Sequence, residues 1–297
     1  MIDPAPLTPT TCLAAVLTPT AADGSTDLDV ARRYFASVMD DGVDGLAVAV
    51  HTGRGDRLDI EARSTLISRA REVSGQVVTA VWSGDDPVWP AEAEGAGATA
   101  LLIAPGYPDD PGVEAQRLDR IAEASALPLI AFDLYLRPYD DVTREAVLAH
   151  PAVRAFKSAR MHDAIASQSG IRAAQRHGVP VLTGEDRMFV PSLMWGATGA
   201  LVGIGAAATA VTVRALSAFR AGDGIVAASR ALDSLAEATF RPPFDGYVQR
   251  MAWIAAAEGR IPAEFAHDPA RPAQLSDDER DGVVRAAARA MRGLPLH

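Results

Sequence analysis

The 297-residue chain has almost no lysine and almost no cysteine. It contains one of each, Lys157 and Cys12, and apart from six histidines every other basic side chain is an arginine. A single cysteine excludes an intrachain disulfide and fits a cytoplasmic location. Because Cys12 lies inside an apolar run, we expect it to be a buried structural thiol rather than a nucleophile.

The chain also lacks the segments that mark membrane and nucleic-acid-binding proteins. No apolar run reaches the roughly 20 residues that cross a bilayer, and the start, Met1-Ile2-Asp3-Pro4, has no signal-peptide pattern. The net charge is −10 without a basic cluster, so we expect no nucleic-acid partner. The histidines have no tight ligand spacing, so we predict no metal site. The composition, with 48% hydrophobic residues, is that of a globular protein with enough apolar side chains for a large core.

A repeated unit organises most of the chain: a glycine helix stop followed within a few residues by a continuous apolar strand. It is clearest at residues 42–50, 95–103 and 196–202. Strands that are apolar at every position are buried on both faces, as parallel strands covered by helices are. The apolar runs predict eight strands, at residues 11–17, 46–50, 76–81, 100–103, 129–132, 153–156, 181–183 and 200–202.

Helices are predicted between these strands. Helical signals occur at residues 28–39, 60–72, 87–94, 113–124, 144–148, 163–176, 188–195 and 209–219. This alternation predicts an α/β fold, a (β/α)₈ TIM barrel, and the missing glycine-rich dinucleotide fingerprint argues against a Rossmann domain. Further helices at residues 225–240, 247–258 and 278–291 predict a C-terminal helical appendage. We therefore divide the chain into a barrel, residues 1–222, and a helical region, residues 223–297, that packs on the barrel and serves packing or assembly more than chemistry.

Lys157 stands at the predicted C-terminal end of the sixth strand, and barrel enzymes carry their chemistry at the C-terminal ends of the strands. An amine held there can condense with a ketone if burial or a neighbouring cation keeps part of it neutral. Arginine cannot form such an imine because it does not deprotonate. The ordinary alternative is a surface lysine, yet arginine has replaced lysine everywhere else in the chain. We therefore predict that Lys157 is catalytic.

Polar residues follow other predicted strands at the same end of the barrel. His51, Thr52, Gly53 and Arg54 combine open backbone N–H groups, a hydroxyl and a guanidinium, which suits a carboxylate; a plain turn is an equally good interpretation. Tyr135 could shuttle a proton beside Lys157 or only cap the barrel rim.

The remaining strand-end candidates are small or charged residues in the other loops. The acids Glu185 and Asp186 could orient the amine or cap the next helix. The other candidates are Tyr107, Arg137, Gly203 and Gly205.

The combination resembles the dihydrodipicolinate synthase and N-acetylneuraminate lyase family of class I, Schiff-base-forming lyases. The resemblance covers residues 13–222 and continues more loosely through the C-terminal helices. The family's Gly-x-x-Val-x-x-x-Thr-Gly-x-x-x-x-Leu pattern matches Gly45, Val48, Thr52, Gly53 and Leu58. Its Pro-x-Tyr loop matches Pro105 to Tyr107, and its strand-end lysine matches Lys157. Its Ser-Gly-Asp/Glu-Asp motif resembles Thr183 to Asp186.

The resemblance implies an enzyme without a cofactor, in which a covalent imine forms on Lys157. Its implied partners are a 2-oxo acid such as pyruvate and an aldehyde. It also implies a homo-oligomer, a tetramer or a dimer, in which Tyr107 reaches a neighbouring subunit.

The chain departs from the family pattern at three places. His51 replaces a threonine that relays a proton in the family, and Arg54 replaces a glutamate. Tyr135 keeps the spacing of the family's Tyr-Asn-x-Pro motif, whereas counting from Pro128 places Phe132 at the tyrosine position. The arginine-bearing turn that holds the second substrate in the synthases is replaced by residues 139–141, so we do not expect the lysine-pathway enzyme.

We therefore predict a class I lyase or aldolase acting on pyruvate or another 2-oxo acid through Lys157, with Tyr135 and His51 exchanging protons. Arg54 or Arg137 nearby would lower the pKa of the amine. The predicted substrate-binding residues are Thr52, Gly53, Arg54, Tyr107, Arg137, Gly203 and Gly205. Two alternatives remain: a Schiff-base dehydratase or hydratase-aldolase for a sugar acid or aromatic substrate, and a barrel that binds a ligand without catalysis.

Overall fold

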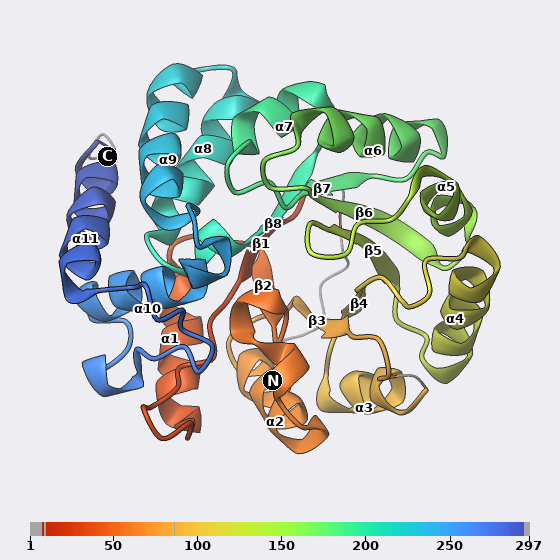
Figure 1. Ribbon diagram of the computed structural model, residues 1–297, viewed down its shortest axis with the longest axis horizontal. Helices are drawn as coiled ribbons and strands as arrows, with labels where there is room; N and C mark the ends of the chain where they lie inside the picture. Colours follow the sequence, from red (N-terminus) through yellow and green to blue (C-terminus); the bar gives the residue numbers. More distant parts are fainter. Residues whose placement is uncertain (1–7, 9, 86, 294–297) are drawn as a thin grey trace.

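The structure, a computed structural model, describes residues 8, 10–85 and 87–293. Parallel strands in chain order form a closed barrel surrounded by helices (Figure 1), which confirms the predicted (β/α)₈ fold. β1 pairs with both β2 and β8 and so closes the cylinder. The strands are β1 Cys12–Ala15, β2 Gly45–Val48, β3 Val77–Val81, β4 Ala100–Ile103, β5 Leu129–Leu134, β6 Val153–Ala159, β7 Val181–Thr183 and β8 Gly199–Val202. The signal-peptide expectation concerns Met1 to Pro4, which lie outside the described residues.

Many of the barrel helices begin or end at capping residues that the sequence supplies. Aspartate side chains accept backbone N–H groups at the start of α1, α2, α4, α5 and α6. Gly97 and Gly196, with φ of 104° and 117°, end α3 and α7 in the left-handed region. These helices are α1 Leu28–Asp40, α2 Ile60–Arg71, α3 Val88–Ala96, α4 Pro111–Ala124, α5 Asp141–Ala149, α6 Ala164–Arg176, α7 Phe189–Trp195 and α8 Thr209–Ala221.

Alternate residues of each strand face the barrel interior, which is filled by small and branched side chains. On β6 this interior cluster contains Ala155 and Ala159. Lys157 lies between them at the two-residue period of a strand and therefore points to the same side. The strand continues two residues beyond Lys157, whereas the sequence predicts that it ends at Phe156.

The C-terminal helices lie together beside α8 (Figure 1). They are α9 Ile225–Thr239, α10 Tyr247–Ala257 and α11 Asp277–Arg292. α10 also contacts η3 Gly203–Ala206, the turn that follows β8, so the C-terminal region reaches the end of the barrel where the strands terminate. Among the described residues, no helix is long and apolar enough to span a membrane.

Arg250 fixes the connection between α9 and α10. Its side chain is fully buried, and its guanidinium donates to the carbonyl oxygens of residues 239, 241, 242 and 243 and to the Glu279 carboxylate at 2.7 Å. The connection has no strand or long helix of its own, so these hydrogen bonds determine where α10 begins. Arg250 therefore determines the position of Tyr247, the first residue of α10.

We predict that Arg250→Met lowers the free energy of unfolding by about 2–4 kcal/mol, because several buried carbonyl oxygens and a carboxylate lose their donor. Urea denaturation followed by circular dichroism measures the change. The matched control is Arg280→Met on α11, whose half-exposed guanidinium has ion-pair distances of 3.6 and 4.0 Å. It should change stability by less than about 0.5 kcal/mol. Equal effects of the two variants would contradict the role assigned to Arg250.

Candidate active site

Lys157 is buried in the mouth of the barrel. The residue is 6% exposed, and its Nζ lies 4.0 Å from the centroid of the Phe132 ring. This contact arises because the two residues are direct partners in the β5–β6 ladder. Gly184, just after β7, leaves room for the lysine stem, since a Cβ there would lie 2.5 Å from Lys157 Cε. Strand register and a missing side chain thus hold the amine in place.

The amine lines a small cavity, here called the lysine cavity, of about 30 Å³. This is roughly room for one water molecule, so a 2-oxo acid can enter only if lining side chains shift. The other lining residues are Val50, His51, Thr52, Phe132, Leu134, Tyr135, Ala159, Met161, Gly184, Asp186, Gly203, Phe240 and Tyr247. Most of these side chains are apolar or aromatic, so a charge in the cavity is poorly solvated.

Burial lowers the pKa of Lys157 from 10.5 to about 8, against the carboxylates of Asp186 and Glu185, which raise it. About a tenth of the amine is then neutral at pH 7. The sequence predicts that Arg54 or Arg137 lowers the pKa of Lys157. In the structure burial lowers this pKa instead, so that prediction is corrected. The amine is accordingly nucleophilic near neutral pH.

The two acids after β7 have different positions. Glu185 accepts hydrogen bonds from the Ser158 hydroxyl and from two backbone N–H groups at the end of β6, at 2.8–2.9 Å, so it fixes that strand end. Asp186 lines the lysine cavity and accepts the N–H of Ile204 at 2.7 Å. Burial raises the pKa of Asp186 to about 7. Asp186 is thus the cavity acid that interacts with the Lys157 ammonium.

Tyr247 brings a hydroxyl from the C-terminal region into the lysine cavity. Its oxygen lies 2.9 Å from His51 Nδ1 and 3.0 Å from Thr52 Oγ1. Its ring stacks on Phe240, with centroids 4.6 Å apart. Gly203 allows this approach, because a Cβ there would lie 3.0 Å from Tyr247 Cε2. No local pattern identifies Tyr247, and treating the C-terminal helices as packing alone overlooked it.

Tyr135 also lines the lysine cavity but lies beyond the end of β5. Its ring meets His51 edge to face, with centroids 5.9 Å apart, and its buried hydroxyl has no hydrogen-bond partner. Phe132 occupies the strand position opposite Lys157. The alignment counted from Pro128, which places Phe132 at the family's tyrosine position, therefore agrees with the strand register. Tyr135 lies in the turn that follows β5.

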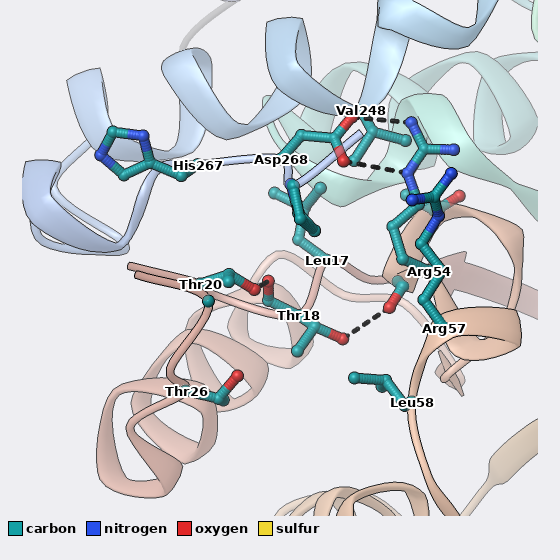
Figure 2. A pocket seen from close by; sticks show the side chains of 14 residues that line it. Leu17, Thr18, Thr20, Thr26, Arg54, Arg57, Leu58, Val248, His267 and Asp268 are labelled. Atoms are coloured by element: carbon teal, nitrogen blue, oxygen red, sulfur yellow. Dashed lines mark hydrogen bonds and ion pairs between the residues drawn. The ribbon is translucent and has the colours of Figure 1, made fainter. Parts of the chain in front are cut away.

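Arg54 joins the loop after β2 to the C-terminal region. Its guanidinium donates to Asp268 at 3.0 and 2.7 Å and to Asp245 at 2.7 Å. Figure 2 shows the Arg54–Asp268 pair at the wall of a second cavity of about 290 Å³, which Arg57 and Thr18 also line. The sequence predicts that Arg54 binds the substrate carboxylate. Because Asp245 and Asp268 already hold its guanidinium, we correct this role: Arg54 links the loop after β2 to the C-terminal region.

The remaining predicted residues are divided between the cavity and its surroundings. Gly203 lines the lysine cavity, whereas Gly53 lines the second cavity. Gly205 packs against Ala14, and Tyr107 is 79% exposed with the Arg137 guanidinium 5.8 Å from its ring centroid. Within the described part of the chain, no group of three or more His, Cys, Asp or Glu side chains is placed to hold a metal ion.

A (β/α)₈ barrel with a buried, partly neutral lysine near the C-terminal end of β6 has the fold and the amine that a lyase of the class I aldolase type needs. The chain belongs to the dihydrodipicolinate synthetase family, whose model matches residues 8–287. The family resemblance seen in the motifs is therefore confirmed.

Relatives of known name and solved structures agree with this assignment. The 4-hydroxy-tetrahydrodipicolinate synthase of Mycolicibacterium paratuberculosis is 30% identical over 228 residues, covering 72% of this chain and 73% of the relative. That of Bifidobacterium longum is 29% identical over 292 residues, 93% of each chain. YagE, a prophage protein of the dihydrodipicolinic acid synthase family from E. coli K12 solved with pyruvate, superposes with a TM-score of 0.82 at 19% identity, covering 95% of this chain and 98% of YagE.

We predict that Asp186→Asn lowers the pH at which the Lys157 amine becomes reactive. The carboxylate stabilises the ammonium form, so removing its charge lowers the pKa of Lys157 below about 8. Reductive methylation with formaldehyde and cyanoborohydride, followed on the Lys157 peptide by mass spectrometry across pH, measures the midpoint. Asp281→Asn, an exposed acid of α11, is the control and should leave the midpoint unchanged. An unchanged or higher midpoint in Asp186→Asn is the contrary result.

Proposed function

We propose that this protein is a class I lyase or aldolase in which Lys157 forms an imine with pyruvate or another 2-oxo acid. The observation that carries the proposal is the burial of the chain's only lysine in the barrel mouth, where desolvation keeps part of the amine neutral. Two similar solved proteins, YagE and the chloride-inhibited dihydrodipicolinate synthase from Acinetobacter baumannii, are described in complex with pyruvate. Pyruvate is therefore the first acid to test.

The proposed chemistry begins with attack of the neutral Nζ on the carbonyl carbon of the 2-oxo acid. Loss of water then leaves an iminium, which withdraws electrons from the neighbouring carbon. A carbon–carbon bond to an aldehyde can be formed or broken there. The imine is covalent and the reaction as proposed uses no cofactor.

The carboxylate of the 2-oxo acid would bind at Thr52, beside Gly203, because the N–H groups of Gly53, Arg54 and Gly55 already donate to carbonyl oxygens of the same loop. Tyr135 would donate to the substrate, because its buried hydroxyl lacks a partner in the free enzyme. The lining by Phe132, Met161 and other apolar side chains favours an aldehyde with an apolar portion.

We propose that the second substrate differs from that of the 4-hydroxy-tetrahydrodipicolinate synthases. Where the synthases carry an arginine-bearing turn, this chain has Tyr139 buried, with its backbone N–H bound to Asp133 at 3.1 Å. Asp133 is in turn paired with Arg160 at 2.8 Å, so this arginine is also committed. Residues 139–141 therefore present no guanidinium to a second carboxylate, and the exposed Arg137 of the same loop, which donates to the Pro105 carbonyl at 3.4 Å, remains the candidate ligand for a polar group of the second substrate.

We also propose a cytoplasmic homo-oligomer, a dimer or a tetramer. Cys12 is buried in β1 without a disulfide partner, as suits a reducing compartment. Tyr107 and Leu136 are 79% and 59% exposed, and large exposed side chains of this kind suit a contact with a second copy of the chain.

We predict that borohydride added in the presence of pyruvate fixes a reduced adduct on Lys157. Peptide mapping by mass spectrometry identifies the site, and the chain's single lysine leaves only the N-terminal amine to distinguish. Lys157→Met should abolish the adduct, and Lys157→Arg should do the same while keeping the charge. No adduct on Lys157 with pyruvate or a panel of other 2-oxo acids would refute the proposed function.

A further inference from the structure

Imine formation requires an acid and a base beside the amine. The carbonyl oxygen must gain protons before it leaves as water, and the attacking nitrogen must lose one. Among the described residues that line the lysine cavity, Tyr135 and Tyr247 each carry a hydroxyl that can give and take a proton, whereas Asp186 is the acid that interacts with the Lys157 ammonium. The other titratable lining residues are His51, Asp186 and Lys157 itself.

The two tyrosines differ in how firmly they are held. The Tyr135 hydroxyl has no hydrogen-bond partner. The Tyr247 hydroxyl lies within hydrogen-bond distance of both His51 Nδ1 and Thr52 Oγ1, and its ring is stacked against Phe240. A phenolate formed at Tyr247 could accept hydrogen bonds from both neighbours, whereas one formed at Tyr135 would be unpaired in an apolar pocket.

Tyr247 is also connected to the solvent. The other ring nitrogen of His51, Nε2, lies 3.8 Å from Asp245 Oδ1. The Asp245 side chain is 43% exposed and is held by Arg54 at 2.7 Å. Burial and the nearby Arg54 charge lower the pKa of His51 to about 4, so its neutral ring can give a proton at one nitrogen and take one at the other.

We propose that Tyr247 is the acid and base of imine formation, positioned by Thr52 and supplied with protons through His51 from the side of Asp245. This inference rests on the proposed function of Lys157. It transfers to Tyr247 the proton-exchange role that the sequence predicts for Tyr135, and it makes the C-terminal region part of the catalytic machinery.

The neutral Nζ adds to the carbonyl carbon, the C=O π bond breaks, and the oxygen takes the Tyr247 proton. The phenolate then removes a proton from the new ammonium nitrogen, giving a neutral carbinolamine. Tyr247 next protonates the carbinolamine hydroxyl, which leaves as water while the nitrogen lone pair forms the C=N⁺ bond. The phenolate regains its proton from His51 Nδ1 as Nε2 takes one from a solvent hydronium ion, so that imine formation consumes one proton and releases one water overall.

The test compares Tyr247→Phe with Tyr135→Phe, a matched pair that removes one hydroxyl from each tyrosine of the lysine cavity. Wild type and variants are mixed with pyruvate and quenched with borohydride at timed intervals, and the adduct on Lys157 is measured by mass spectrometry. We expect Tyr247→Phe to slow adduct formation about 100-fold. We expect Tyr135→Phe, which removes a hydrogen bond to the bound substrate, to raise the pyruvate concentration that gives the half-maximal rate, whereas Tyr247→Phe lowers the maximal rate. Both variants should keep the native circular dichroism spectrum.

A second readout separates proton transfer from binding. An acid and base catalyst speeds imine formation and hydrolysis alike, so the final proportion of adduct in Tyr247→Phe should equal that of wild type. A proportion that falls along with the rate shows that Tyr247 only binds or packs, and overturns the inference. An unchanged rate in Tyr247→Phe overturns it as well, while a wild type that forms no adduct overturns the proposed function itself.

Discussion

The desolvation of a single amine is the constraint on which the site depends. β6 directs Lys157 into the barrel, Phe132 supplies an apolar surface 4.0 Å from Nζ, and Gly184 leaves the space through which the stem passes. In water the amine would be an inert ammonium. Here burial lowers its pKa while the Asp186 carboxylate limits the change, so that both charge states are populated close to neutral pH.

The C-terminal region completes this site. Arg250 fixes the connection that leads into α10, and Arg54 ties the loop after β2 to Asp245 and Asp268. These buried arginines use directed hydrogen bonds to position segments that have little secondary structure of their own. The result is that Tyr247 meets Thr52 in the barrel mouth, and the lysine cavity is closed to about the volume of one water.

Much of the fold could be predicted because its signals are local. Apolar runs, glycine stops and aspartate caps each act over a few residues, and all eight strands were identified near their observed bounds. Lys157 was recognisable because barrel topology gathers strand ends at one place. The partners of Arg54 and the position of Tyr247 depend on contacts across about 190 residues or more of chain, which no local pattern records. Likewise, only the observed β5–β6 register decides between Phe132 and Tyr135 as the residue opposite Lys157.

The most direct measurement is the titration of the amine itself. Protein grown with lysine labelled with ¹³C at Cε gives one lysine resonance, since the chain has one lysine. Its chemical shift followed against pH reports the protonation of Lys157 without any substrate. We predict a midpoint near pH 8, well below the ordinary 10.5. A midpoint at or above 10.5 would show an ordinary solvated or ion-paired ammonium and would contradict a desolvated amine at Lys157.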